Sequence, residues 1–152
     1  MTARGRLEVG EVRSGRPLTL SLARVLSFSG GPIDAPNWPE RNLHTDPAKA
    51  REAGLAHLIA SGTQSEGMLI GFLIDLFGDD WYAGGELDVR FVKPVQVNDT
   101  VTPHVRCAAS DVVDGASRIT LDCWCQVADG SHVVEGSARC TVGAGARSPA
   151  AP

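Results

Sequence analysis

The chain has 152 residues, of which 43% are hydrophobic and 21% are charged, and its formal net charge is -4 at pH 7. This length and composition predict one domain with a single core and exclude a mainly disordered chain. Because the chain has no basic excess, nothing in it favours binding to nucleic acid or to an anionic membrane surface. No apolar run is long enough to span a bilayer and the first residues lack a signal-peptide pattern, so we expect a cytoplasmic protein.

Four cysteines occur in strand-like segments, without the C-x-x-C spacing that favours a structural zinc site. They are Cys107, Cys123, Cys125 and Cys140. We interpret them as small buried hydrophobic side chains, with a metal site or a disulfide as the minority alternative, and expect no metal or other cofactor. Residues 143–152 combine small residues with prolines, which predicts a flexible tail after a domain formed by residues 1–142.

The first third of the chain is irregular, with two short predicted elements. Residues 18–28 alternate apolar and polar at their start, which predicts a strand before the Gly-Gly-Pro break that follows. Three prolines in residues 32–43 indicate a loop. Asp46 and the proline after it are typical of a helix start, so we expect a short helix to about Glu52 that Gly54 ends.

The strongest helix pattern covers residues 63–77. Its apolar positions recur at helical spacing and extend almost all round the helix; they are Met68, Leu69, Ile70, Phe72, Leu73, Ile74, Leu76 and Phe77. A helix that is apolar on nearly every side is expected to be buried.

Four predicted strands follow this helix, and each has one apolar face. The apolar faces consist of Leu87, Val89 and Phe91; Val101, Val105 and Cys107; Ile119, Leu121, Cys123, Cys125 and Val127; and Val134, Ala138, Cys140 and Val142. The short Asp-Gly turns at residues 114–115 and 129–130 favour antiparallel pairing. A buried helix followed by four one-sided strands predicts an α+β fold in which a curved antiparallel sheet wraps round a long central helix, the hot-dog arrangement.

Three motifs between residues 28 and 102 carry a resemblance to a known family. Leu43-His44-x-Asp46 is followed by Ala48 and Ala50, and Ile59-Ala60-Ser61-Gly62 opens the central helix. The third motif is GELDVRFVKPVQVNDTV at residues 85–101. In this order and spacing they resemble the MaoC-like hydratases and dehydratases. That resemblance implies a hot-dog fold, activity on an acyl thioester of coenzyme A or a carrier protein, and a homodimer or a dimer of dimers.

The hydration motif of that family, Asp-x-Asn-Pro-x-His, is incomplete in this chain. His44 matches the histidine, but Pro39 stands at the aspartate position and Arg41 at the asparagine position. One imidazole must then activate water, and the proton delivered to carbon needs another source. We predict His44 and Glu66 as the catalytic pair, because other hot-dog dehydratases combine a loop histidine with an acidic residue on the partner's central helix.

Asp34 and Glu40 are the alternative carboxylates, since the proline-rich loop could bring either close to the imidazole. The unpaired amides of Gly62 and Thr63 at the helix start are predicted to polarise a thioester carbonyl. Ser61 and Asn42 complete the predicted substrate-binding set.

Each of these residues also has a structural interpretation. His44 could only hydrogen-bond a loop, Glu66 could close a capping box, and Asp46 is assigned mainly to capping. Three functions therefore stay open: a hydratase or dehydratase of 2-enoyl or 3-hydroxyacyl thioesters, a thioesterase on the same scaffold, and a non-catalytic acyl-binding subunit.

The remaining aromatic residues and histidines are predicted to have structural roles. Trp81 and Tyr82 follow the central helix and should pack at its end. Trp124 faces away from that helix and is a candidate subunit contact. We expect surface or loop positions for the other histidines, His57, His104 and His132.

Overall fold

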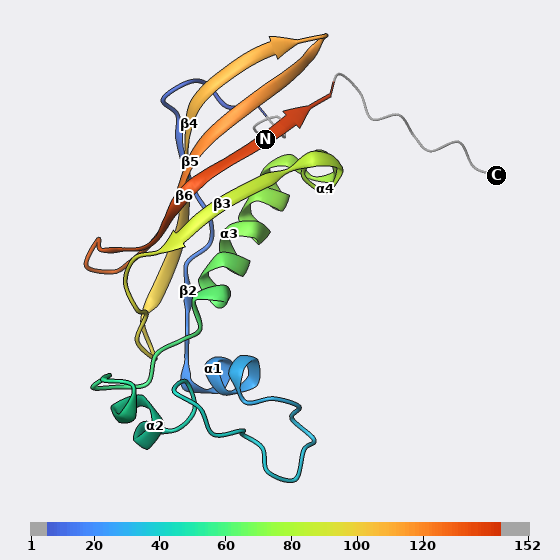
Figure 1. The fold of residues 1–152 in the computed structure, drawn as a ribbon. Coiled ribbons are helices and arrows are strands. Elements are labelled where there is room, and N and C mark those ends of the chain that lie inside the picture. The colour runs from blue at the N-terminus through green and yellow to red at the C-terminus, as the bar shows by residue number, and fades with distance from the viewer. Residues whose placement is uncertain (1–5, 144–152) are drawn as a thin grey trace, which may run out of the picture.

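One curved antiparallel sheet holds the chain together in the computed structural model, which describes residues 6–143 (Figure 1). The six strands are β1 (Val12–Ser14), β2 (Leu18–Thr19), β3 (Glu86–Phe91), β4 (Thr100–Val113), β5 (Ala116–Val127) and β6 (His132–Val142). Their order is β1-β4-β5-β6-β3, and β2 also pairs with β4. The predicted α+β hot-dog architecture is confirmed, including antiparallel pairing throughout.

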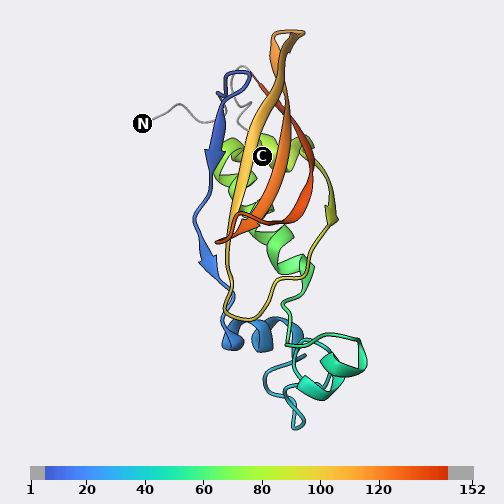
Figure 2. The same cartoon turned by 90° about the vertical axis from the view of Figure 1, so that its left-hand side faces the viewer.

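The four helices are α1 (Leu22–Ser29), α2 (Pro47–Glu52), α3 (Gly62–Phe77) and α4 (Asp79–Gly84). The long helix α3 lies across the hollow face of the sheet, and the sheet curves round it (Figure 2). Helices α1 and α2, with the loop between them, gather at the end of the molecule where α3 begins (Figure 1). The irregular first third of the chain therefore lies beside the start of the central helix.

Helix α3 forms as its apolar pattern predicts, but only one side of it is buried. Leu69 and Leu73 are fully buried against the sheet, whereas Gly67, Gly71 and Asp75 are exposed. The prediction that the whole helix is buried is wrong for the single chain, because one sheet covers one side of a helix. The exposed residues on the uncovered side are small or charged.

The hairpins β4-β5 and β5-β6 have their predicted turns and faces. Asp114 and Gly115 both have positive φ, 52° and 80°, as a tight Asp-Gly hairpin turn requires. The four cysteines are buried, as predicted. Burial raises the pKa of the Cys123 and Cys125 thiols to about 12, so both are protonated hydrophobic groups at neutral pH.

Residues 18–28 do not form the predicted strand. Only Leu18 and Thr19 pair with β4, and helix α1 follows after Ser21, whose hydroxyl accepts a hydrogen bond from the Arg24 amide. The apolar positions Leu22, Val25 and Leu26 fit helical spacing as well, and Val25 is fully buried. The Ser21 N-cap therefore favours a helix in a segment whose apolar–polar alternation predicts a strand.

Helix α2 begins as predicted. Asp46 Oδ1 accepts a hydrogen bond of 2.8 Å from the Ala48 amide, and Pro47 occupies the first helical position. Arg41 donates a hydrogen bond to the other carboxylate oxygen of Asp46. The hydrogen bond from Arg41, and to a smaller extent the one from the Ala48 amide, lower the pKa of Asp46. Arg41 thus has a structural partner in the loop.

The predicted packing of the aromatic residues is partly right. Trp81 is buried and stacks on Phe77, but Tyr82 is 72% exposed, so the prediction that it packs at the helix end is wrong. Trp124 faces away from the helix, as predicted, and lies between the rings of His104 and His132. These two histidines are therefore strand residues of the outer sheet surface, and His104 also hydrogen-bonds Ser14.

No helix in residues 6–143 is long and apolar enough to cross a membrane. The predicted flexible tail lies, except for Gly143, outside the described residues.

Candidate active site

A cavity of about 400 Å³ opens at the start of α3. Its wall comes from the His44 loop, residues 59–65, the segment from Phe91 to Val95 and the beginning of β6. His44, Ser61, Gly62 and Thr63, four of the residues predicted from sequence, line this one cavity. The structure therefore brings the loop imidazole and the helix start together.

Two hydrogen bonds hold His44 in place. Its Nδ1 lies 2.8 Å from the Ile59 carbonyl oxygen, and its backbone N–H donates to Asn42 Oδ1 at 2.9 Å. A carbonyl oxygen can only accept, so Nδ1 carries a proton and Nε2 has the free lone pair in the neutral ring. Nε2 has no partner among the described residues. It can therefore take a proton from water or substrate.

Asn42, predicted to bind substrate, positions the histidine loop and does not line the cavity. Its Nδ2 donates a hydrogen bond of 2.7 Å to the Ser29 carbonyl at the end of α1. Its Oδ1 accepts from the backbone of His44. One side chain thus ties the loop to α1 and sets the position of the imidazole.

The segment before α3 is fixed by pairing with the loop that precedes β4. Ala60 N donates to Val95 O at 2.8 Å, and Val97 N donates to Leu58 O at 3.2 Å. Ile59 lies between these bonds, so the carbonyl that orients His44 is itself held in a short ladder. The ring is therefore placed by backbone geometry.

The first amides of α3 are free to bind a ligand. Gly62 N and Thr63 N have no hydrogen-bond partner among the described residues. The cap residue Ser61 makes no side-chain bond to them, and its hydroxyl instead lies 2.7 Å from the Thr63 hydroxyl. Unpaired N–H groups at the positive end of the helix dipole favour an oxygen that gains negative charge.

Gly62 also makes a close contact that the sequence did not reveal. A Cβ at this position would lie 2.7 Å from Cδ1 and 2.8 Å from Cε1 of Phe91. The ring of Phe91, although 52% exposed, therefore packs against the backbone where α3 begins. Phe91 covers part of the cavity wall and limits the space for an acyl group.

Within residues 6–143, no carboxylate of the same chain contributes to this cavity. The ionisable residues in its wall are His44 and Lys93. Glu66 lies outside it and makes no hydrogen bond or ion pair among the described residues, and Asp34 and Glu40 are exposed loop residues. The predicted pairing of His44 with Glu66 is therefore not made within one chain.

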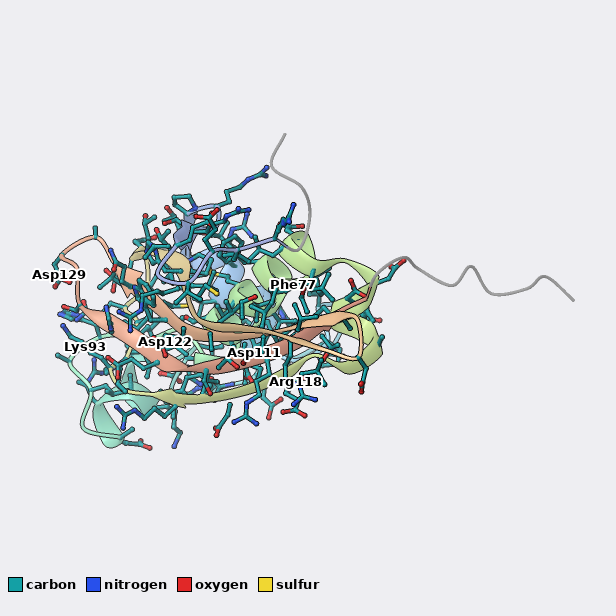
Figure 3. All side chains as sticks on the ribbon, turned by 90° about the horizontal axis from the view of Figure 1, so that it is seen from above. Phe77, Lys93, Asp111, Arg118, Asp122 and Asp129 are labelled. Atoms are coloured by element: carbon teal, nitrogen blue, oxygen red, sulfur yellow. The ribbon has the colours of Figure 1, made fainter. Side chains whose placement is uncertain are left out.

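Lys93 lies at the rim of the cavity, beside the β5-β6 turn. Its Nζ is 3.0 Å from Ser131 Oγ and 4.0 Å from an Asp129 carboxylate oxygen. Figure 3 shows Lys93 and Asp129 at the same end of the sheet. This ion pair is about half exposed, so it is weak and leaves N–H groups of the ammonium free for an anion.

Sequence reasoning missed Ser65, Phe91 and Lys93 as cavity residues. Ser65 was hidden inside an apolar helix pattern, Phe91 is the last residue of β3, and Lys93 lies two residues beyond that strand. Only the polar interruption at Ser65 in an otherwise apolar face could have drawn attention to it.

The described residues contain no group of three or more His, Cys, Asp or Glu side chains that could hold a metal ion. The arrangement instead offers a proton acceptor, an oxyanion site and hydroxyl groups around a small, partly apolar space. Such a site can activate water and stabilise an enolate or a tetrahedral oxyanion.

The family described as "MaoC like domain" matches residues 39–122, which include the His44 loop and the start of α3. No curated protein matches the chain by sequence. Among solved structures, the MaoC-like dehydratase from Rhodospirillum rubrum has a TM-score of 0.70 and 19% identity, covering 90% of this chain and 92% of that one.

Two further solved structures are similar. The (R)-hydratase from A. caviae involved in PHA biosynthesis has a TM-score of 0.64 and 25% identity, over 91% of this chain and 98% of that one. The truncated HadBC (3R-hydroxyacyl-ACP dehydratase) complex from Mycobacterium tuberculosis has a TM-score of 0.57 and 18% identity, over 88% and 96%.

Proposed function

The chain belongs to the MaoC-like domain family, and on that premise we propose that it is a hydratase or dehydratase of 2-enoyl and 3-hydroxyacyl thioesters. The observation that carries the proposal is that one cavity is lined by His44, whose Nε2 is unpaired, and by Gly62 and Thr63, whose amides are unpaired. Acyl thioesters of coenzyme A are the proposed substrates, and carrier-protein thioesters are the alternative.

In the hydration direction, His44 Nε2 takes a proton from water while the water oxygen bonds to C3 of the enoyl group. The electron pair of the double bond moves to the thioester oxygen, where the amides of Gly62 and Thr63 stabilise the enolate. A proton then adds to C2 and completes the 3-hydroxyacyl thioester. Dehydration is the same sequence in reverse.

The C2 proton needs a source outside this wall, because none of the described residues that line the cavity is a carboxylate. We propose that Glu66 of a second copy supplies it, with a homodimer or a dimer of dimers as the working unit. β3 is an edge strand, and Phe91 and Val92 at its end are 52% and 43% exposed beside the cavity. A second chain that covers this edge would also enclose the cavity.

Mixed dimers test both parts of the mechanism. His44→Ala and Glu66→Gln should each lose hydration of a short enoyl-CoA, by about 10²- to 10⁴-fold, with unchanged far-UV circular dichroism. Co-folding the two inactive variants should restore activity, because one site per dimer then has both groups. Full activity of His44→Ala alone would refute the proposal, and failure of the mixture to recover would remove Glu66 from it.

The lack of a carboxylate among the described residues of the cavity wall favours a second candidate, a non-catalytic acyl-binding subunit. It would bind saturated acyl-CoA and convert no thioester. Hydrolysis is distinguished in the same assays, because a thioesterase releases free thiol and a hydratase does not. The cytoplasmic location expected from the sequence stays a prediction.

A further inference from the structure

Ser65 is the single polar side chain that is fully buried within residues 6–143, and its hydroxyl has no hydrogen-bond partner. A serine inside a helix commonly bonds the carbonyl four residues earlier, which here belongs to Ser61, but this bond is absent. The Ser65 backbone carbonyl accepts a bond of 3.5 Å from Cys125 Sγ, so the residue lies on the side of α3 that faces β5.

An unpaired buried hydroxyl lowers the free energy of unfolding, because it gives up its hydrogen bonds to water and forms none within the protein. Alanine would fit this helix position with better intrinsic propensity and no unpaired group. Packing and helix formation therefore give no reason for serine here. Unpaired polar groups of this kind call for another explanation, and ligand binding is one that the surroundings support.

Ser65 lies beside the proposed substrate site. Ser65 forms part of the wall of the cavity that also contains His44 and Gly62. It lies three residues, or about 4.5 Å, further along the helix axis than Gly62. An extended acyl chain whose thioester oxygen rests on the Gly62 amide, and which runs along α3, would reach the level of Ser65 at roughly its fourth or fifth carbon.

We propose that the Ser65 hydroxyl determines specificity by hydrogen-bonding an oxygen on the fourth or fifth carbon of the acyl chain. The cavity then selects hydroxy- or oxo-substituted acyl thioesters over plain alkyl ones. This inference rests on the proposed function for the position of the thioester, but its test does not need turnover. In the free protein Ser65 has no exposed surface, so its hydroxyl rotates toward the cavity to gain its partner when the substrate binds.

Binding of saturated coenzyme A thioesters, which cannot be hydrated, gives the direct test. Calorimetry would compare pentanoyl-CoA with 4-hydroxypentanoyl-CoA and 5-hydroxypentanoyl-CoA on the wild-type protein, Ser65→Ala and Ser65→Cys. The wild type should bind one hydroxylated thioester about tenfold more tightly than pentanoyl-CoA, and in both variants this ratio should fall toward one. Ser110→Ala, which changes an exposed serine of β4, should keep the wild-type ratio.

Thermal unfolding supplies a readout that an ordinary structural serine would not give. Ser65→Ala and Ser65→Cys should both raise Tm, by about 2–4 °C, because they remove an unpaired hydroxyl. Cysteine is the informative case, since its helix propensity does not exceed that of serine. A fall in Tm for both variants would show that the hydroxyl has a structural partner and would overturn the inference.

An unchanged binding ratio in Ser65→Ala and Ser65→Cys would overturn it equally. Failure of the proposed function looks different, since the wild type would then hydrate no enoyl thioester while the binding ratio could still depend on Ser65.

Discussion

The contact between Gly62 and Phe91 leads to a prediction that separates packing from catalysis. In Gly62→Ala, the new Cβ would lie 2.7 Å from Phe91 Cδ1, whereas carbon atoms normally approach to about 3.5–4.0 Å. The ring must therefore move by about 1 Å. Because Phe91 is 52% exposed, it can move outward, which places the cost near the low end of overpacking, about 1–2 kcal/mol.

For a chain of 152 residues, this cost corresponds to a fall in Tm of about 2–8 °C. In a Phe91→Ala background the same Gly62→Ala change should cost nothing or stabilise slightly, because alanine favours a helix over glycine. Urea unfolding of the wild type, the two single variants and the double variant gives a coupling free energy, expected to be about 1–2 kcal/mol.

A Gly62→Ala cost that is the same with and without the Phe91 ring would refute this reasoning. Hydration assays on the same proteins add a second result. If the thioester carbonyl also needs the space at Gly62, the double variant should be stable and yet inactive. If the glycine serves only the ring, the double variant should regain turnover.

Two further predictions concern positioning and pH. Asn42→Ala removes the hydrogen bond to the Ser29 carbonyl and the acceptor for the His44 backbone N–H. The free energy of unfolding should therefore fall by about 1–3 kcal/mol, and kcat should fall with little change in KM. An unchanged kcat would show that the loop positions His44 without Asn42. Desolvation by burial, and to a smaller extent the charge of the nearby His132, lower the pKa of His104. The unfolded chain therefore binds a proton at His104 more readily than the folded chain does. The free energy of unfolding keeps the full contribution of neutral His104 above about pH 6.5 and loses it as the pH falls below that value. Urea unfolding at several pH values between 7.5 and 5 should show a shallower acid loss in His104→Gln than in the wild type, and equal slopes would contradict the prediction.

The sequence by itself determined the central helix, the four long strands and the short helix after Asp46, because their signals are local. Strand alternation and helical spacing each act over a few residues, and the tight turns at 114–115 and 129–130 have side chains suited to them. Residues 18–28 were ambiguous because their apolar positions fit both periods, and the Ser21 cap decided for a helix.

The tertiary structure alone decided which side chains share the cavity. Neighbouring helix residues point about 100° apart, so the way α3 lies on the sheet decides that Ser65 meets the cavity and Glu66 does not. The orientation of His44 depends on a carbonyl fifteen residues away, which the pairing with residues 95–97 holds in place. Local sequence determines which elements form, whereas contacts between distant segments determine which of their side chains meet.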